Sequence, residues 1–345
     1  MPRFELQDVS VDDLIADRVT SPLAFEALRS EWRALWTRCV DATPFQSPDW
    51  LIPWWRHLGA GAGQLEVLTL RLDQRLVGLA PWVVQTDENG RTLRSLGVGV
   101  SDYLGPILDP DVRIAGAYAI AEFLNTYQLS WDRADFSDLR PDSVLLNLPM
   151  PVAGAVEIVP CASCPSVDLH PDRRARLASS WRQKLDYDWR RLRRTGEVVI
   201  ERVQEENAPE LFDALVELHT ARWTEKDGGR GVLADEAVQR FHRDVVPAFL
   251  AVEVLRLNGL RVDGAIVASY YGFLRGDRAY YYLGGFSPEW DRFGVGNLMV
   301  DDAMSEAARE GAHTFDFLRG QEAYKYRWGA RDEITFRWTW RVPRD

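Results

Sequence analysis

Cysteine and histidine are scarce in this chain of 345 residues, which has three cysteines and five histidines. Three cysteines do not make a disulfide framework, so we expect a reducing compartment. Cys161 and Cys164 form a C-x-x-C pair. A zinc site needs about four ligands, and a redox pair of the thioredoxin type opens a helix. Neither context surrounds this pair, so we interpret it as a chance spacing in a connector and expect no metal site.

Long apolar runs and a positive net charge are also lacking. The longest uncharged apolar run in the C-terminal half is GAIVASYYGFL, about half of the ~20 residues that a membrane-spanning helix needs. The N-terminal segment MPRFELQDVSVDD is acidic and has no apolar region of the signal-peptide kind. We therefore expect a cytoplasmic protein without a membrane span. The net charge of −11 disfavours nucleic acid and anionic membranes as partners.

The sequence has enough apolar residues, 46%, for a large core, and its length predicts about two domains. The two halves repeat one order of elements: an amphipathic helix, a strand meander and a second helix. The predicted helices span 23–39, 113–127, 210–226 and 295–311, and the meanders begin near 65 and 252. Prolines cluster between 149 and 165. We predict an N-terminal domain over 1–160 and a C-terminal domain over 161–345.

The second meander contains two turn signals. Asn258-Gly259 stands between alternating apolar residues, a pattern that predicts a hairpin turn there. Gly276-Asp277 predicts the next turn, which leads into RAYYYLGGFS. The expected architecture of each half is therefore a mixed, mostly antiparallel sheet flanked by helices, in the α/β class.

The segment DRFGVGNLMVDDAMSEAAREG, residues 291–311, opens a predicted helix with two glycines, Gly294 and Gly296. The first turn of a helix has unpaired N–H groups that attract phosphate oxygens. Glycine lets a diphosphate approach because it has no Cβ, and Arg292 adds a charged donor. The alternative is a tight strand-to-helix turn without a ligand. The equivalent place in the first half, GPILDPDVRI, has no glycine pair, so we assign the site to the second half.

The residues around the two glycines distinguish a dinucleotide-binding site from an acyl-CoA site. A dinucleotide fingerprint requires a third glycine where Met299 stands, in a βαβ unit. Antiparallel strands, an anion-binding turn, a helix and another strand instead resemble the GNAT acyltransferase superfamily. Its turn, [QR]-x-x-G-x-[GA], is matched by residues 291–296 except that Asp291 takes the first place.

The segment HTFDFLRGQEAYKYRWGARDEITFRWTW, residues 313–340, resembles the C-terminal signature of the CelD-like GNAT acetyltransferases, which are associated with exopolysaccharide biosynthesis. Segments 45–59 and 218–229 also resemble that group. The doubled layout is more distantly similar to the Fem-type aminoacyltransferases, which have two GNAT-like domains. The resemblance implies two tandem GNAT-like domains, of which the second binds acyl-CoA. The implied cofactor-binding residues are Phe286, Arg292, Phe293, Gly294, Val295, Gly296 and Asn297.

The resemblance also implies direct acyl transfer, which needs a base, oxyanion stabilisation and a proton for the leaving thiolate. Asp316 alternates with Phe315 and Phe317 and is a candidate base, or else a structural carboxylate paired with Arg319 or Arg331. Glu322, after Gly320, is the rival base, or else a solvated side chain.

Three further residues are candidates for the chemistry. Lys325, in YKYRWG, corresponds to the lysine of an F-K-x-x-F-G-like segment in Fem-type enzymes and is a candidate for stabilising the carbonyl oxygen. The alternative is a surface lysine between packing tyrosines. Tyr324 and Tyr282 are candidate proton donors to the thiolate, or packing residues of strands.

The acceptor side is expected at the L-H-x-x-R-W segment. His219 and Arg222 share a helix face, with Trp223 beside them, although a buried structural histidine is the alternative. Arg319 is a further candidate for acceptor binding. Trp50, Trp54 and Trp55 are interpreted as a hydrophobic wedge, with a sugar platform as the alternative.

Residues 173–194 are basic, in contrast to the negative net charge of the whole chain. Eight Arg and one Lys accompany two Asp, a net charge of +7, with apolar residues at helical spacing. The pattern predicts a helix with a solvated basic face. The functional alternative is a landing surface for the CoA 3′-phosphate, a nucleotide-sugar, a lipid-linked phosphate or tRNA.

The sequence thus favours an acyl-CoA-dependent acyltransferase without a metal. Its expected acceptor is an amine or hydroxyl of a small molecule or saccharide. Two alternatives stay open, an aminoacyl-tRNA-dependent transferase and a non-catalytic scaffold of polysaccharide synthesis. The sequence does not predict the oligomeric state.

Overall fold

The computed structural model describes residues 9–59, 61, 63–149, 154–227 and 231–341, with residues 225–227 described by their backbone alone. The chain divides into two compact units. Unit 1 comprises Met1–Ala162 and Ile334–Asp345, and unit 2 comprises Ser163–Glu333. The divisions fall inside two long strands, so the C-terminal strand of the chain belongs mainly to unit 1.

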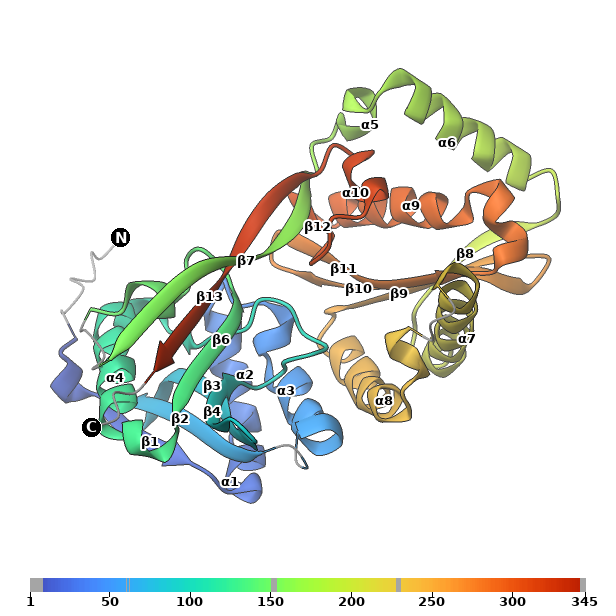
Figure 1. The fold of residues 1–345 in the computed structure, drawn as a ribbon. Helices are drawn as coiled ribbons and strands as arrows, with labels where there is room; N and C mark the ends of the chain where they lie inside the picture. Colours follow the sequence, from blue (N-terminus) through green and yellow to red (C-terminus); the bar gives the residue numbers. More distant parts are fainter. Residues whose placement is uncertain (1–8, 60, 62, 150–153, 228–230, 342–345) are drawn as a thin grey trace. The chain divides into compact units, whose positions relative to one another are not determined.

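Unit 1 contains a mixed sheet and four α-helices in its described residues (Figure 1). The strands pair in the order β1-β2-β3-β4-β6-β13, and β4 and β6 are parallel. The helices are α1 (Pro22–Ala27), α2 (Arg29–Arg38), α3 (Pro48–Trp54) and α4 (Arg113–Thr126). The strands are β1 (Ile15–Val19), β2 (Gln64–Leu72), β3 (Arg75–Asp87), β4 (Gly90–Ser95), β5 (Ile107–Leu108), β6 (Arg133–Leu139) and β13 (Arg331–Arg341).

Aromatic residues dominate the core of unit 1. Trp82 stacks on Phe136, which in turn stacks on Trp338 of the C-terminal strand. Trp50 is fully buried and donates from Nε1 to Ser101 Oγ at 2.7 Å. Trp54 and Trp55 are buried as well, which agrees with a hydrophobic wedge and leaves no exposed ring platform for a sugar.

Unit 2 repeats this arrangement. Its strands pair in the order β7-β12-β11-β10-β9-β8, with β11 and β12 parallel and the other pairs antiparallel. The helices are α5 (Arg173–Arg176), α6 (Ser179–Leu192), α7 (Ala208–Asp227), α8 (Glu236–Leu250), α9 (Val295–Arg309) and α10 (Ala323–Tyr326). The strands are β7 (Ala155–Asp168), β8 (Val198–Arg202), β9 (Leu255–Val262), β10 (Ala265–Arg275), β11 (Arg278–Phe286) and β12 (Thr314–Asp316).

The helices of unit 2 cover both faces of its sheet. Figure 1 shows α9 on one face with α6 outside it, and α7 and α8 on the other. The α6 helix buries Trp181, Leu185 and Leu192, which recur at helical spacing, against α9 and its neighbours. The predicted basic helix therefore exists over Ser179–Leu192, with its apolar stripe on α9, whereas Arg173–Arg176 form the separate short helix α5.

The second meander turns at a different place from the one predicted. Asn258 and Gly259 lie inside β9, and the chain turns at Asp263-Gly264, where φ is +48° and +85°. The Asn-Gly hairpin prediction is therefore wrong. Gly259 instead allows α7 to approach closely, because a Cβ there would lie 2.8 Å from Cδ2 of Leu211. The predicted turn at Gly276-Asp277 lies between β10 and β11.

Cys161 and Cys164 lie in the strand β7, rather than in a connector. Among the described residues, no helix is both long and apolar enough to cross a membrane.

Candidate acyl-donor site

The strands β11 and β12 separate after a short stretch of pairing. Parallel pairing joins Arg278–Tyr280 to Thr314–Asp316, and β11 then continues alone on that side to Phe286. Past Asp316 the chain turns away, and Phe317 N donates to Pro165 O of β7 at 2.9 Å. The edge of β11 beyond Tyr280 therefore borders an opening in the sheet.

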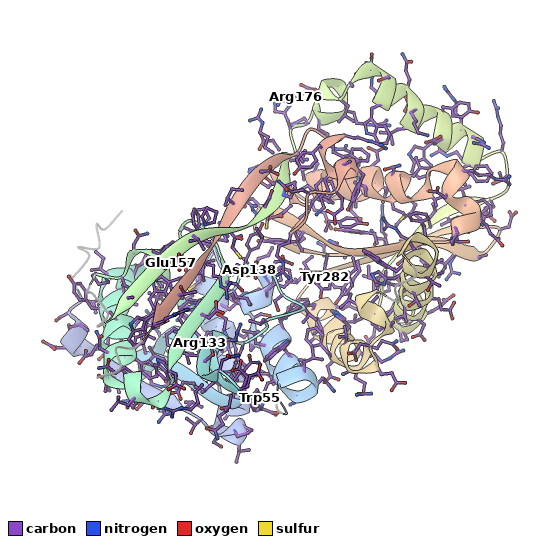
Figure 2. The ribbon with its side chains drawn as sticks, viewed as in Figure 1. Trp55, Arg133, Asp138, Glu157, Arg176 and Tyr282 are labelled. Atoms are coloured by element: carbon purple, nitrogen blue, oxygen red, sulfur yellow. The ribbon has the colours of Figure 1, made fainter. Side chains whose placement is uncertain are left out.

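A β-bulge in β11 lies beside this opening. Tyr271 pairs with Leu283 and Gly272 pairs with Tyr281, so Tyr282 is the extra residue. A bulge resets the alternation of a strand and re-aims its side chains. Tyr281 consequently packs with Phe317 on the α9 face, whereas the Tyr282 hydroxyl lies 3.5 Å from His242 Nε2 on the other face (Figure 2).

The predicted glycine turn connects β11 to α9. A short 3₁₀ helix, Pro288–Phe293, ends at Gly294, which has a left-handed backbone (φ +68°) and is the N-cap of α9. No side chain caps this helix. The first-turn amides of Val295 and Gly296 therefore point outward without an intrahelical acceptor.

Asp188 of α6 restricts the turn from behind. A Cβ on Gly294 would lie 2.6 Å from Oδ2 of Asp188, and φ there already disfavours L side chains. Lys184 Nζ binds the same Asp188 oxygen at 2.7 Å. Gly294 is thus required by the local geometry, independently of any ligand.

A cavity of about 170 Å³ joins the strand opening to the glycine turn. Its walls come from β10, β11, the turn, α7, α9 and the segment around α10. The lining residues are Arg222, Ser269, Tyr281, Gly284, Gly285, Phe286, Asp291, Gly294, Gly296, Asn297, Met299, Val300, Tyr324 and Arg327. The topology thereby brings together residues that are up to 105 positions apart, from Arg222 to Arg327.

The charged lining residues give this cavity a formal charge of +1. Arg222 and Arg327 are the cations, and Asp291 is the anion. The Arg222 guanidinium lies over the Phe286 ring, 4.9 Å from its centroid, which fixes it at the end of β11. The balance favours an anionic ligand, and Asp291 weakens that preference.

Two phenols provide the proton-donating groups of the cavity. Burial raises the pKa of Tyr324, and burial also raises the pKa of Tyr281, although the nearby Arg222 charge opposes both shifts. Both hydroxyls therefore stay protonated at neutral pH. The charge of Glu322 also raises the pKa of both phenols. Glu322 itself is not among the described residues that line the cavity.

Asp316 lies outside this cavity and is fully buried. Its Oδ2 is 2.8 Å from Arg278 Nη1, and its Oδ1 accepts from Leu318 N at 2.8 Å. Leu318 has φ +57°, so this second bond holds a strained turn after β12. The contacts support a structural role for Asp316, with Arg278 as a partner that the sequence did not predict.

Lys325 is also buried and does not line the cavity. Its Nζ donates to the carbonyl oxygens of Leu318 (3.2 Å), Arg319 (2.8 Å) and Gly320 (2.9 Å). A fourth contact, at 2.9 Å, joins it to Oε2 of Glu322, whose side chain is half exposed. The ammonium thus shapes the loop after β12 and positions Glu322.

The remaining predicted residues fall into two groups. Phe286, Gly294, Gly296, Asn297, Arg222 and Tyr324 line the cavity, whereas Arg292, Phe293, Val295, His219, Trp223, Tyr282 and Arg319 do not. His219 is buried and accepts from Trp223 Nε1 at 3.1 Å. Burial and then the Arg222 charge lower the His219 pKa to about 4, so the ring is neutral.

Sequence reasoning missed Tyr281, Arg327 and Asp291 as lining residues with polar groups. Tyr281 and Tyr282 are adjacent in the sequence, and only the bulge decides which one faces the cavity. Arg327 belongs to the segment YKYRWG, and its position two residues after Lys325 could have identified it as a site residue.

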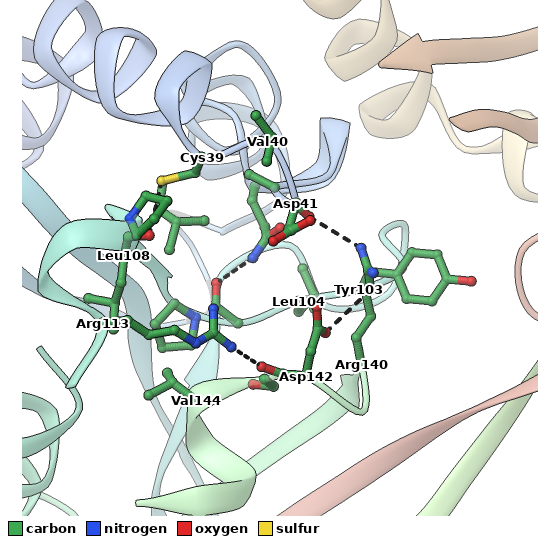
Figure 3. A pocket seen from close by; sticks show the side chains of 17 residues that line it. Cys39, Val40, Asp41, Tyr103, Leu104, Leu108, Arg113, Arg140, Asp142 and Val144 are labelled. Atoms are coloured by element: carbon green, nitrogen blue, oxygen red, sulfur yellow. Dashed lines mark hydrogen bonds and ion pairs between the residues drawn. The ribbon is translucent and has the colours of Figure 1, made fainter. Parts of the chain in front are cut away.

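Unit 1 has a cavity of about 380 Å³ at the corresponding place, before α4 and after β6 (Figure 3). Its helix entrance carries Asp109, which accepts from Asp111 N and binds Arg38 Nε at 2.9 Å. Arg113 donates to the Asp142 carbonyl, and Arg140 donates to the Asp41 carbonyl at 3.2 Å. A carboxylate occupies the helix entrance here, which disfavours a diphosphate.

A protein-family model matches the region of unit 2 that contains the cavity. Residues 179–326 match the model of the acetyltransferase (GNAT) domain. The GNAT match begins with α6 and ends at Tyr326, so it includes the glycine turn and nearly all of the cavity lining. No curated protein matches the sequence.

Solved structures resemble the whole chain. The crystal structure of FemX has a TM-score of 0.63 and 12% identity, over 93% of this chain and 96% of FemX. The C-terminal domain of a putative lysylphosphatidylglycerol synthetase from Agrobacterium fabrum has a TM-score of 0.58 and 14% identity, over 92% of each chain. L-PGS from Bacillus licheniformis has a TM-score of 0.55 and 13% identity, over 87% of this chain and 93% of L-PGS. These likenesses confirm the predicted α/β fold, and the GNAT match covers the part of unit 2 from residue 179 to residue 326.

Proposed function

We propose that this protein is an acyl-CoA-dependent acyltransferase that moves an acetyl or longer acyl group to an amine or hydroxyl. The main support is the cavity that connects the β11–β12 opening with the bare helix entrance at Gly294–Gly296. An acyl-CoA has a diphosphate for the helix entrance and a narrow pantetheine arm for the strand opening. The GNAT match over 179–326 supports the same donor class.

In this proposal the protein binds the donor at two places. The amides of Val295 and Gly296 donate to diphosphate oxygens, and Arg222 and Arg327 supply positive charge to the same cavity. The free edge of β11 beyond Tyr280 offers backbone groups to the amides of the pantetheine arm. The thioester then lies toward Tyr281 and Tyr324.

The proposed chemistry uses groups of the cavity and its rim. The acceptor nitrogen or oxygen attacks the thioester carbon, and Glu322 takes the proton that the acceptor loses. Collapse of the intermediate breaks the C–S bond, and Tyr281 or Tyr324 gives its proton to the departing thiolate sulfur. Lys325 holds Glu322 at this place, with Nζ 2.9 Å from Oε2.

The acceptor class is proposed from the sequence. The resemblance of residues 313–340 to CelD-like proteins supports a saccharide or another small molecule of cell-envelope synthesis.

A charge placed in the cavity tests the donor site. Asn297 lies in the first turn of α9 and lines the cavity, and Glu is well tolerated in a first helical turn. We expect Asn297→Glu to weaken acetyl-CoA binding at least tenfold, by about 1.4 kcal/mol or more, because its carboxylate repels the diphosphate. Asn297→Gln is the neutral control. Calorimetric titration of acetyl-CoA and CoA against the parent and both variants measures the effect.

Equal binding by parent and Asn297→Glu would place CoA elsewhere. Absence of CoA binding by the parent protein would remove the acyl-CoA proposal altogether.

The fold likeness to FemX supports a second candidate, an aminoacyl-tRNA-dependent transferase. Salt-sensitive tRNA binding in the absence of any CoA response would favour it. A protein that binds neither CoA nor tRNA would leave the non-catalytic scaffold.

A further inference from the structure

The positive charge of this chain is concentrated on α6 and the residues at its two ends. Residues 173–194 contain eight arginines, one lysine and two aspartates, a net charge of +7. The rest of the chain has 32 basic and 50 acidic residues, a net charge of −18. Figure 1 shows α6 outside α9, so α6 is the outer layer of unit 2 on that side of its sheet. Such charge asymmetry indicates an anionic partner.

Carboxylates neutralise only three of these nine cations. Arg173 is buried and pairs with a carboxylate of α9 at 3.1 Å. Arg174 Nη2 lies 3.1 Å from Asp186 Oδ1, and Lys184 Nζ lies 2.7 Å from Asp188 Oδ2. Both aspartates of the segment are therefore already paired.

Six arginines are left without a carboxylate partner among the described residues. They are Arg176, Arg182, Arg190, Arg191, Arg193 and Arg194. The guanidinium groups of Arg182 and Arg191 donate to carbonyl oxygens, which leaves their charge uncompensated, and the other four arginines are exposed. Exposed arginines elsewhere, such as Arg56 and Arg243, pair with carboxylates at 2.5–2.7 Å. The uncompensated charge on α6 is thus a local feature.

The surface of α6 that solvent reaches is polar. Its apolar stripe is buried in the core of unit 2 and comprises Trp181, Leu185 and Leu192. Arg190 lies on the outer side of the last helical turn, and Arg193 and Arg194 follow in the turn that ends the helix. Tyr187 is 54% exposed. A partner therefore meets guanidinium groups and one phenol, without an apolar stripe that could insert into it.

The acidic residues elsewhere in the chain do not cancel this local charge. With 14 residues, α6 is ~21 Å long. The Debye length is about 8 Å at physiological ionic strength, so exposed charges farther away than this are largely screened. The net charge of −11 disfavours an anionic membrane for the chain as a whole, but it does not decide what this helix face binds.

We propose that the outer face of α6 docks unit 2 onto a bilayer of anionic lipids. Clusters of four to eight Lys or Arg on an amphipathic helix bind the headgroups of such lipids, and six unpaired arginines are available here. Guanidinium groups form charge-assisted hydrogen bonds with the headgroup phosphates. Because the apolar stripe is buried, the contact is peripheral and reversible by salt. The inference does not depend on the acyl donor, and it adds a location for the reaction.

The aromatic residues of the segment favour a lipid surface over single-stranded nucleic acid. Bases of a single strand stack on several exposed rings. Trp181 is buried, and the half-buried Trp189 lies under the Arg193 guanidinium, 5.2 Å from it. Tyr187 is then the one exposed ring of residues 173–194, all of which the structure describes.

Sedimentation with lipid vesicles tests the proposal. Vesicles of equal parts phosphatidylglycerol and phosphatidylcholine are compared with vesicles of phosphatidylcholine alone, at about 0.1 M and about 0.5 M NaCl. We expect the full chain to sediment with the anionic vesicles at the lower salt concentration and to be released at the higher one. It should not sediment with the neutral vesicles.

Double variants locate the contact. Arg190→Gln with Arg194→Gln removes two exposed charges and should weaken binding to the anionic vesicles about tenfold or more. Arg190→Lys with Arg194→Lys keeps both charges and should bind within about threefold of the parent. Arg75→Gln with Arg240→Gln is the matched control, because it changes the net charge equally at exposed sites outside the segment. All three variants should melt within about 2 °C of the parent.

Several results would overturn the inference. One is a parent protein that does not sediment with the anionic vesicles, or that sediments equally with the neutral ones. Another is an equal effect of the two Gln double variants, which would place the contact elsewhere. Binding of tRNA but not of vesicles, lost in Arg190→Gln with Arg194→Gln, would assign the face to nucleic acid.

Calorimetric titration with acetyl-CoA keeps the two proposals apart. A protein that docks on anionic vesicles but binds no CoA retains this inference and loses the proposed function. A protein that binds CoA but no vesicles retains the proposed function alone.

Discussion

Replacing Lys325 by Met tests whether its ammonium is structural or chemical. The Met side chain keeps most of the buried apolar stem, but it removes the donor to three carbonyl oxygens at 2.8–3.2 Å. A hydrogen bond from a charged donor is worth about 1.5–3 kcal/mol, and burial of the ammonium itself is costly. Since Lys325 is only 3% exposed, we expect a net loss of about 3–5 kcal/mol.

Calorimetric melting measures this loss. For a unit of this size, one kcal/mol corresponds to about 2–4 °C, so the transition of unit 2 should fall by roughly 10 °C. Arg190→Met removes an exposed cation of α6 and should melt within about 2 °C of the parent. Ser163–Glu333 and the remainder of the chain need not melt together, so each transition is compared with its own counterpart.

The opposite result would refute the structural interpretation. If Lys325→Met melts like the parent but transfers no acyl group, the ammonium serves the reaction and the carbonyl contacts are incidental.

Three further predictions concern charge and protonation. Asp291 is the one carboxylate among the described residues that line the donor cavity. Asp291→Gln should therefore tighten acetyl-CoA binding about threefold to tenfold, and an unchanged affinity in calorimetric titration would contradict this prediction. Glu322→Gln should lower kcat about 100-fold or more, while the KM for acyl-CoA stays within about twofold. An unaltered kcat would exclude Glu322 as the base. Burial lowers the His219 pKa from its ordinary value of 6.5 to about 4. The contribution of the neutral ring to stability is therefore complete above pH 6.5 and is lost as the pH falls toward 4. Between pH 7 and 4.5 this amounts to about 2 kcal/mol, and His219→Gln should flatten the pH dependence of urea unfolding by that amount; an identical slope would show that His219 is not buried as neutral imidazole.

Local patterns in the sequence predicted the elements that build the donor site. Apolar periodicity predicted α7 and α9 to within a few residues of their observed bounds. The glycine spacing predicted an uncapped helix entrance at Gly294, because a positive φ and free first-turn amides are properties of a few consecutive residues. The basic segment at 173–194 was likewise predicted as a helix with an apolar stripe.

Contacts between distant segments decided which side chains face the cavity. In the sequence, Asp316 and Lys325 are both suited to a role in the chemistry. In the structure, Asp316 pairs with Arg278, which is 38 positions away, and Lys325 donates to the carbonyl oxygens after β12. One extra residue in β11 turned Tyr281 toward the cavity and Tyr282 away from it. Asn258 and Gly259 continue the strand β9 instead of turning, and Gly259 lies against Leu211 of α7.

The sequence by itself determined the helices α4, α7 and α9 and the glycine entrance, because their free energies depend on residues within one or two helical turns. The tertiary structure decided the roles of the charged and aromatic residues. Burial and pairing set those roles, and both depend on which segments the fold brings together.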